Sequence, residues 1–138
     1  MNEMTRVWER IYVGDRNDAE RLGKSNPAGI TSIVSLCEEK VPRRNYAINY
    51  VHLPIADAKP IRVGQFDAII EALTEDIRLG TVLIHCSSGV SRAPIMAAAW
   101  MELVGYKNID AALEEIGRLR PMIAPSKALV SSVRRHLK

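Results

Sequence analysis

The sequence has few aromatic residues: they occupy 5% of its 138 positions. Proteins that bind single-stranded nucleic acid stack bases on aromatic side chains, so nucleic acid is not expected as a partner. The longest apolar run, APIMAAAWM, is far shorter than the roughly 20 residues of a membrane-spanning helix. The beginning of the chain also lacks the basic and apolar segments of a secretory signal. We therefore expect a cytoplasmic monomer with neither nucleic acid nor a membrane as partner.

Cysteine is also scarce, with only Cys37 and Cys86, and a reducing compartment argues against a permanent structural bridge between them. No repeat, low-complexity stretch or linker interrupts the chain, which predicts one domain over residues 1–138. The composition, 47% hydrophobic and 25% charged, is that of a globular protein, and the net charge of +3 mildly favours anionic partners.

Alternating apolar runs predict an α/β fold with a central, mostly parallel sheet of four to five strands flanked by helices. Short β-branched runs predict strands at 10–15, 30–36, 49–55 and 81–86. Helical spacing of apolar residues predicts helices at 65–80, 92–106, 108–120 and 126–138, with Asn108 and Ser126 as N-caps of the last two. Ligands of such sheets bind beyond the carboxyl ends of the strands, where the stretch HCSSGVSR lies at residues 85–92.

This stretch joins a buried strand to a helix within a few residues, so the backbone amides of Ser87, Ser88, Gly89, Val90, Ser91 and Arg92 are predicted to converge on one anion. Gly89 permits the tight wrap. Cys86 at the floor of this nest is favoured as a thiolate, which is a nucleophile facing a bound oxyanion. The planar guanidinium of Arg92 can hold two oxygens of a tetrahedral anion.

A phosphate ester also needs a proton donor for its leaving group. Asp57 is the best candidate, because it follows the strand at 49–55 and loops after neighbouring parallel strands meet over one site. Asp67 lies in the following helix and is expected to be solvated. Strand alternation points His85 away from the pocket, where it braces the loop by hydrogen bonds and does not act as a base.

These roles predict in-line attack by Cys86, protonation of the leaving group by Asp57, and hydrolysis of a phosphocysteine by water that Asp57 activates. Neither a metal nor another cofactor is required. Rhodanese-like sulfur transfer and arsenate reduction also use a cysteine-centred anion loop, but the spacing, Arg92 and Asp57 favour phosphoryl chemistry.

Together these residues resemble the dual-specificity branch of the cysteine-dependent protein tyrosine phosphatases, whose signature is His-Cys-x2-Gly-x2-Arg followed by Ser or Thr. The segments RIYVGD, GITSIVSL, YVHLPIAD, FDAIIEAL, TVLIHCSSGVSR and RLRPMIAPS occur in the family's order. The resemblance implies that Cys86 is the nucleophile of the phosphatase P-loop, Arg92 the phosphate clamp and Asp57 the general acid.

Two positions depart from the family's pattern. Ala93 replaces the Ser or Thr whose hydroxyl stabilises the departing thiolate, so hydrolysis of the phosphocysteine should be slow. Ser126 stands where the family often has Asn, and it can still cap a helix. The phosphatases of regenerating liver share the RAP ending and have a cysteine where Cys37 stands, which suggests a reversible Cys37–Cys86 disulfide. A small core residue is nevertheless the preferred interpretation of Cys37, and the disulfide is the alternative. Those relatives end in a prenylation motif, and RRHLK is not one.

Three functions compete. The first is a phosphatase of phosphorylated proteins that acts on phosphotyrosine and also on phosphoserine or phosphothreonine, because no inserted recognition segment deepens the pocket. The second is a phosphatase of a phosphoinositide or a nucleic-acid 5′ phosphate, although the loop lacks the Lys of lipid-type relatives. The third is a phosphate-binding module with slow turnover. The basic residues Arg43, Arg44 and the tail SSVRRHLK are either solvated or guide an acidic substrate.

Overall fold

A computed structural model describes residues 3–42 and 45–138, so the expectation for Arg43 and Arg44 lies outside the described residues. The strands are β1 (Thr5–Trp8), β2 (Ile11–Gly14), β3 (Ser32–Ser35), β4 (Asn49–His52) and β5 (Val82–His85). The helices are α1 (Arg16–Arg21), α2 (Val63–Leu79), α3 (Arg92–Leu103), α4 (Ile109–Leu119) and α5 (Lys127–His136).

The five strands form one sheet in the order β1-β2-β5-β3-β4. β1 pairs antiparallel with β2, and the other four strands run parallel to one another. Parallel strands are covered on both faces, so they appear in sequence as continuous apolar runs, and β3 and β5 are buried at every residue. The predicted α/β fold with a mostly parallel sheet is therefore confirmed.

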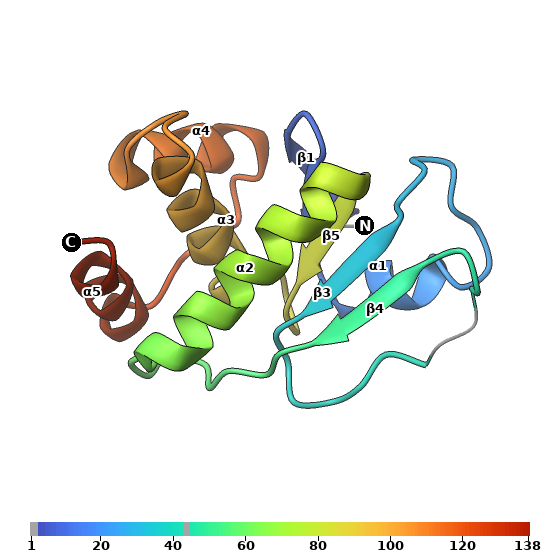
Figure 1. Cartoon of the computed structure of the whole chain (residues 1–138), viewed down its shortest axis with the longest axis horizontal. Helices are drawn as coiled ribbons and strands as arrows, with labels where there is room; N and C mark the ends of the chain where they lie inside the picture. Colours follow the sequence, from blue (N-terminus) through green and yellow to red (C-terminus); the bar gives the residue numbers. More distant parts are fainter. Residues whose placement is uncertain (1–2, 43–44) are drawn as a thin grey trace.

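Side chains alternate between the two faces of the sheet and form two separate cores. Val34 and Ile84 belong to the larger core, under the helices α2, α3, α4 and α5, whereas Ile33 and Leu83 belong to a smaller core with residues of α1 (Figure 1). Cys86 joins the larger core. The site is therefore assembled at the edge of a sheet that is sandwiched between helices.

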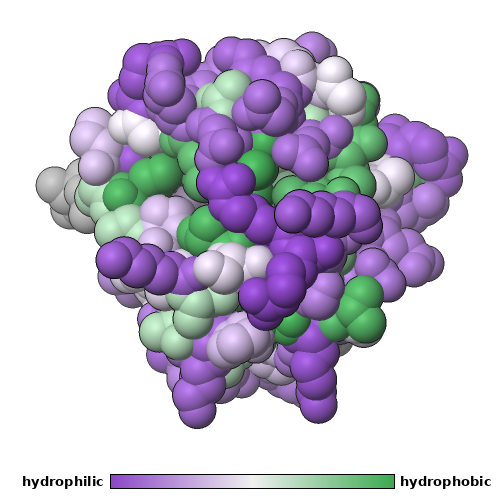
Figure 2. All heavy atoms as spheres, turned by 90° about the vertical axis from the view of Figure 1, so that its left-hand side faces the viewer, coloured by the Kyte–Doolittle hydropathy of each residue, from purple (hydrophilic) through white to green (hydrophobic). Residues whose placement is uncertain are grey.

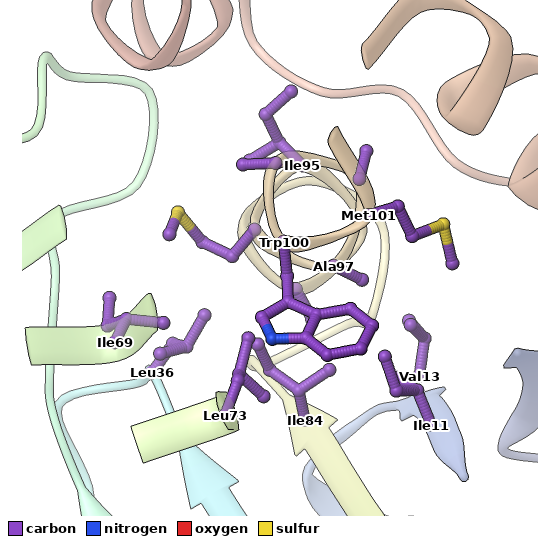
Figure 3. Close-up of a cluster of buried hydrophobic side chains, with 14 of the residues drawn as sticks. Ile11, Val13, Leu36, Ile69, Leu73, Ile84, Ile95, Ala97, Trp100 and Met101 are labelled. Carbon is purple, nitrogen blue, oxygen red and sulfur yellow. The ribbon is translucent and has the colours of Figure 1, made fainter. Parts of the chain in front are cut away.

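Helix α3 occupies the centre of the larger core. All residues from Arg92 to Met101 are buried. Figure 3 shows Trp100 among the side chains of this core, and the centre of its ring lies 5.1 Å from that of Trp8. Small alanine side chains allow the helix to approach its neighbours closely, and α3 packs against α2, α4 and α5. The residue that begins this helix, Arg92, is held in place by this packing.

The helix ends mostly follow the expected capping signals. Asn108 and Ser126 accept hydrogen bonds from Ala111 N and Leu129 N, which confirms both predicted N-caps. Gly80 ends α2, and Gly105, with a φ of 80°, follows the end of α3.

Two elements were not predicted. β1 is a four-residue edge strand, and α1 has six mostly charged residues without apolar periodicity. The available signal for α1 was the capping box of Asp15 and Asp18, in which each side chain accepts from the other's backbone amide. The predicted strands also extend one to three residues too far at one or both ends.

The face beside α4 and α5 is mainly hydrophilic, with its apolar residues in separate areas (Figure 2). Within residues 3–42 and 45–138, no helix combines the length and apolarity needed to cross a membrane. In the last helix Arg134 and Arg135 are exposed, whereas Ser132 and Val133 are buried, so only part of the basic tail is the solvated face that was expected.

Candidate active site

The candidate active site lies where the four parallel strands end. Gly14 of β2 and Ser35 of β3 are both in register with His85 of β5, and Ser35 is in register with His52 of β4. All four strands therefore reach the same edge of the sheet together, and the segments that follow them face one another. Cys86, Arg92 and Asp57 come from two of these segments.

The loop at 86–92 is held by its carbonyl oxygens. Four of these oxygens accept hydrogen bonds from residues outside the loop. Cys86 O accepts from His85 Nδ1 (3.2 Å) and Ser87 O from Arg16 N (3.2 Å). Gly89 O accepts from Arg120 Nε (3.0 Å) and Val90 O from Ala124 N (2.8 Å). In a trans peptide unit the N–H points opposite to the C=O, so these contacts turn the next amides away from the donors. In the part of the chain that the structure describes, the amides of residues 87–92 donate to no protein group.

Gly89 is required at the tightest point of this loop. Its φ of 69° lies in the left-handed region, which other residues adopt at a cost. A Cβ at this position would also stand 2.5 Å from Arg120 Nη2 and 2.7 Å from Gly14 O. Both the backbone conformation and the close packing therefore exclude larger residues.

Arg92 is 4% exposed, and its two edges have different surroundings. Nη1 donates to Ile55 O (2.9 Å), to Glu38 Oε1 (2.8 Å) and more weakly to Leu36 O (3.4 Å). Nη2 donates to Ser87 Oγ at 3.2 Å, and Nε lies 4.0 Å from Asp57 Oδ1. The anchored Nη1 leaves the edge formed by Nε and Nη2 facing the loop and Asp57, which suits bidentate binding of an oxyanion.

The structure brings Asp57 to the site and leaves Asp67 outside it. The side chain of Asp57 is 60% exposed, beside Arg92. Asp67 is exposed on α2. The residue after Asp57, Ala58, has a φ of 57°, which is the sole positive φ of a non-glycine residue among those described. The backbone direction at this strained turn therefore sets the position of Asp57 beside Arg92.

Cys86 and His85 face opposite sides of the sheet, as strand alternation predicts. Cys86 is 2% exposed and belongs to the larger core. The His85 ring is fully buried between Cys86 O and Ser35 Oγ, which lies 2.7 Å from Nε2. Burial lowers the pKa of His85 below its usual 6.5, so the ring is neutral, donates from Nδ1 and accepts from the Ser35 hydroxyl. His85 therefore braces the loop, as expected.

Cys37 follows β3 and is fully buried, and both cysteines are free thiols. Its Sγ donates to Glu39 O at 3.5 Å. Burial, together with the negative charge of Glu39, raises the pKa of the Cys37 thiol above its usual 9.0. This thiol is therefore protonated at neutral pH.

Sequence reasoning missed three residues that hold the site: Arg16, Glu38 and Arg120. Each contacts the loop at 86–92 from a distant part of the chain. Arg120 stood in the family segment RLRPMIAPS without an assigned role, and its full burial is the feature that distinguishes it. Among residues 3–42 and 45–138, no group of three His, Cys, Asp or Glu side chains is placed to hold a metal ion.

Comparisons with known proteins agree with this geometry. Residues 10–137 match the family model described as the Swiss Army Knife protein, DSP-PTPase phosphatase domain. The chain therefore belongs to this family of dual-specificity phosphatase domains.

A similar curated protein is a probable dual specificity protein phosphatase of Dictyostelium discoideum, 23% identical over 99% of this chain and 34% of that protein. Another is dual specificity protein phosphatase 22-A of Danio rerio, 27% identical over 91% of this chain and 61% of the relative. The chain thus spans about one third to three fifths of the length of these relatives.

Solved structures show the same fold. The crystal structure of human DUSP28 has a TM-score of 0.86 at 17% identity, and the match covers 96% of this chain and 94% of that one. The crystal structure of PTPMT1 in complex with PI(5)P has a TM-score of 0.80 at 17% identity, with coverage of 97% and 94%.

Proposed function

We propose that this protein is a cysteine-dependent phosphatase that hydrolyses phosphate monoesters, chiefly phosphotyrosine and also phosphoserine and phosphothreonine in proteins. The supporting observation is the loop at 86–92, whose carbonyl oxygens are tied back while its amides have no protein partner among the described residues. These six amides and the edge of Arg92 formed by Nε and Nη2 suit a phosphoryl group with three equatorial oxygens. Cys86 lies at the base of this loop.

In the first step, the Cys86 thiolate attacks phosphorus and the bond from phosphorus to the ester oxygen breaks. Asp57 gives its proton to that oxygen, so the leaving group departs as a neutral alcohol or phenol. The amides of residues 87–92 and the Arg92 guanidinium stabilise the charge on the three remaining oxygens in the transition state. The product of this step is a phosphocysteine.

In the second step, the Asp57 carboxylate takes a proton from water, whose oxygen attacks phosphorus. The bond from sulfur to phosphorus breaks, and the Cys86 thiolate leaves together with inorganic phosphate. Ala93 offers no hydroxyl to this thiolate, so we expect the second step to limit turnover.

A phosphoinositide is the second candidate substrate. The similar fold of PTPMT1, whose structure contains PI(5)P, favours it. Against it, the segment from Ser87 to Ser91 has no cationic side chain to bind additional phosphates of an inositol ring. We therefore prefer a phosphorylated protein as the substrate.

The decisive experiment compares wild type with Cys86→Ser, Asp57→Asn and Asp67→Asn on an aryl phosphate, a phosphotyrosine peptide and vesicles containing PI(5)P. We expect Cys86→Ser to abolish turnover and Asp57→Asn to lower kcat by roughly 100-fold, the scale of general acid catalysis. Asp67→Asn is the matched control, because it removes one exposed carboxylate of the neighbouring helix, and it should retain wild-type activity.

An acid quench during turnover should trap label on Cys86 of the wild type. If wild type is no faster than Cys86→Ser and no label is trapped, the chain is not a phosphatase, and a phosphate-binding module is the better description. If PI(5)P is consumed faster than the phosphopeptide, the substrate assignment is wrong while the mechanism stands.

A further inference from the structure

Arg120 is a fully buried arginine directly behind the loop at 86–92. It stands at the end of α4 with an exposed fraction of 0%. Its Nη1 donates to Glu3 O (2.7 Å) and Thr5 Oγ1 (2.9 Å), which fixes the guanidinium to the beginning of the chain. Its Nε donates to Gly89 O at 3.0 Å. The side chain thus connects three segments that are remote in sequence.

Arg120 has no acidic counter-ion among the described residues, because no carboxylate oxygen there lies within 4.0 Å of its nitrogens. Nη2 is buried without a hydrogen-bond partner among those residues and stands 2.5 Å from the position that a Cβ of Gly89 would occupy. Buried charges are normally paired, since leaving water is costly for them. An anion bound in the adjacent loop would compensate this charge.

The hydrogen bond to Gly89 O also has a geometric effect. Gly89 C=O and Val90 N–H belong to one planar peptide unit and point in opposite directions. When Arg120 holds the carbonyl from behind, the Val90 amide is turned toward the anion site. The preceding Ser88 amide is turned in the same way by a different donor, Arg16 N, which holds Ser87 O at 3.2 Å.

We propose that Arg120 is a positioning residue for oxyanion binding. It orients the Val90 amide through the Gly89 carbonyl and supplies a buried positive charge that favours an anion in the loop. This inference rests on the proposed function, because the anion it serves is the phosphoryl group.

The test is the binding of inorganic phosphate, followed by the amide signals of Val90 and Ser88 in NMR spectra of the whole chain. We expect Arg120→Met, which removes the charge and all three donor groups, to raise the Kd of phosphate by about tenfold or more, the scale of a charge-assisted hydrogen bond. Arg120→Lys keeps the charge but has no Nε, so it should raise the Kd less. In Arg120→Lys the shift of the Val90 amide on phosphate binding should shrink while that of Ser88 remains.

The matched control is Arg118→Met. Arg118 lies two residues before Arg120, and its replacement removes the same charge. Arg118 is exposed and pairs with Glu114 at 3.1 Å, so phosphate binding should not change. Circular dichroism establishes that each variant is folded. If Arg120→Met does not fold, Arg120→Lys decides through the two amide shifts.

The inference is overturned if folded Arg120 variants bind phosphate like wild type, or if Arg120→Lys reduces both amide shifts equally. A wild type in which phosphate shifts no loop amide contradicts the proposed function as well. These two failures are distinguishable, because the first occurs in a wild type that binds phosphate normally.

Discussion

Ala93 stands where the resemblance to the dual-specificity phosphatases implies a Ser or Thr. It is fully buried in the first turn of α3, immediately after Arg92. We expect Ala93→Ser to accelerate breakdown of the phosphocysteine by about tenfold, because its hydroxyl can donate to the departing thiolate and a hydrogen bond to a charged group contributes roughly 1.5 kcal/mol or more. Rapid-quench kinetics should show a higher steady-state rate and less trapped intermediate than in wild type.

A second buried alanine of the same helix, Ala97, provides the control. Ala97→Ser also buries a hydroxyl but places it one turn further from Cys86, so it can lower stability without changing the burst or the steady-state rate. Unchanged kinetics in a folded Ala93→Ser variant would contradict slow release of the thiolate.

The full burial of Cys37 fits the preferred interpretation of a small core residue, and a reversible disulfide with Cys86 stays the alternative hypothesis. In this hypothesis peroxide oxidises Cys86 to a sulfenic acid, and attack by the Cys37 sulfur then forms the disulfide and releases water. Because the raised pKa keeps Cys37 protonated, its own reaction with peroxide should be slow, and Cys86 should be oxidised first.

Under this hypothesis, peptide mapping after mild peroxide treatment should find a Cys37–Cys86 disulfide that dithiothreitol reverses, with recovery of activity. In Cys37→Ser the same treatment should drive Cys86 to irreversible oxidation. If no bridged peptide forms in wild type, Cys37 is a core residue only.

Among the elements, the segment between β4 and α2 is where backbone strain meets the candidate chemistry. Ala58 adopts its φ of 57° directly after Asp57. The left-handed conformation costs an L-residue such as Ala58 roughly 1–2 kcal/mol of folding free energy. Glycine adopts it freely, but it costs about 0.5–1 kcal/mol because its unfolded chain has more conformational freedom. In Ala58→Gly, relief of the backbone strain and the greater entropy of the unfolded chain therefore change the free energy of unfolding in opposite directions.

We expect Ala58→Gly to leave the free energy of unfolding unchanged or to raise it by up to about 1 kcal/mol, because the relief of strain is the larger effect. Turnover should fall, since a more flexible turn holds Asp57 less firmly beside Arg92. Urea unfolding and kcat measured on the same samples check both. Destabilisation by more than about 1 kcal/mol would show that this turn is not strained.

At the scale of the whole molecule, stability should depend on pH through His85. Burial lowers the pKa of His85 in the folded protein below 6.5, the value that it has in the unfolded chain. Above pH 6.5 the ring is neutral in both states and has no effect. As the pH falls below 6.5 the unfolded chain binds a proton that the folded protein does not, so the free energy of unfolding decreases until the folded pKa is reached.

Urea unfolding at a series of pH values from about 8 to 5 measures this loss. His85→Gln should be less stable near neutrality, because it disturbs the contacts with Cys86 O and Ser35, but it should lose less stability on acidification. The difference between the two proteins separates His85 from His52 and His136. Parallel pH curves for wild type and variant would contradict a buried, neutral His85.

Local sequence patterns were sufficient for the parts of this protein that depend on neighbouring residues. Apolar runs indicated the four parallel strands, helical spacing indicated four of the five helices, and Asn108 and Ser126 marked two helix starts. HCSSGVSR indicated an anion loop, because its glycine, cysteine and arginine stand within a few residues of one another. β1 and α1 were not predicted, because such short elements are stabilised by packing and have no periodic sequence pattern of their own.

Only the tertiary structure decided how the loop at 86–92 is supported. Arg92 contacts Glu38 across 54 residues, Arg120 contacts Gly89 across 31, and the same guanidinium reaches Glu3 across 117. Contacts of this range depend on which strands are neighbours and where they end, and no local periodicity reports that. The sequence by itself thus determined the local pattern of the loop at 86–92 and the residues proposed for its chemistry, while the sheet register decided which distant side chains hold that loop in shape.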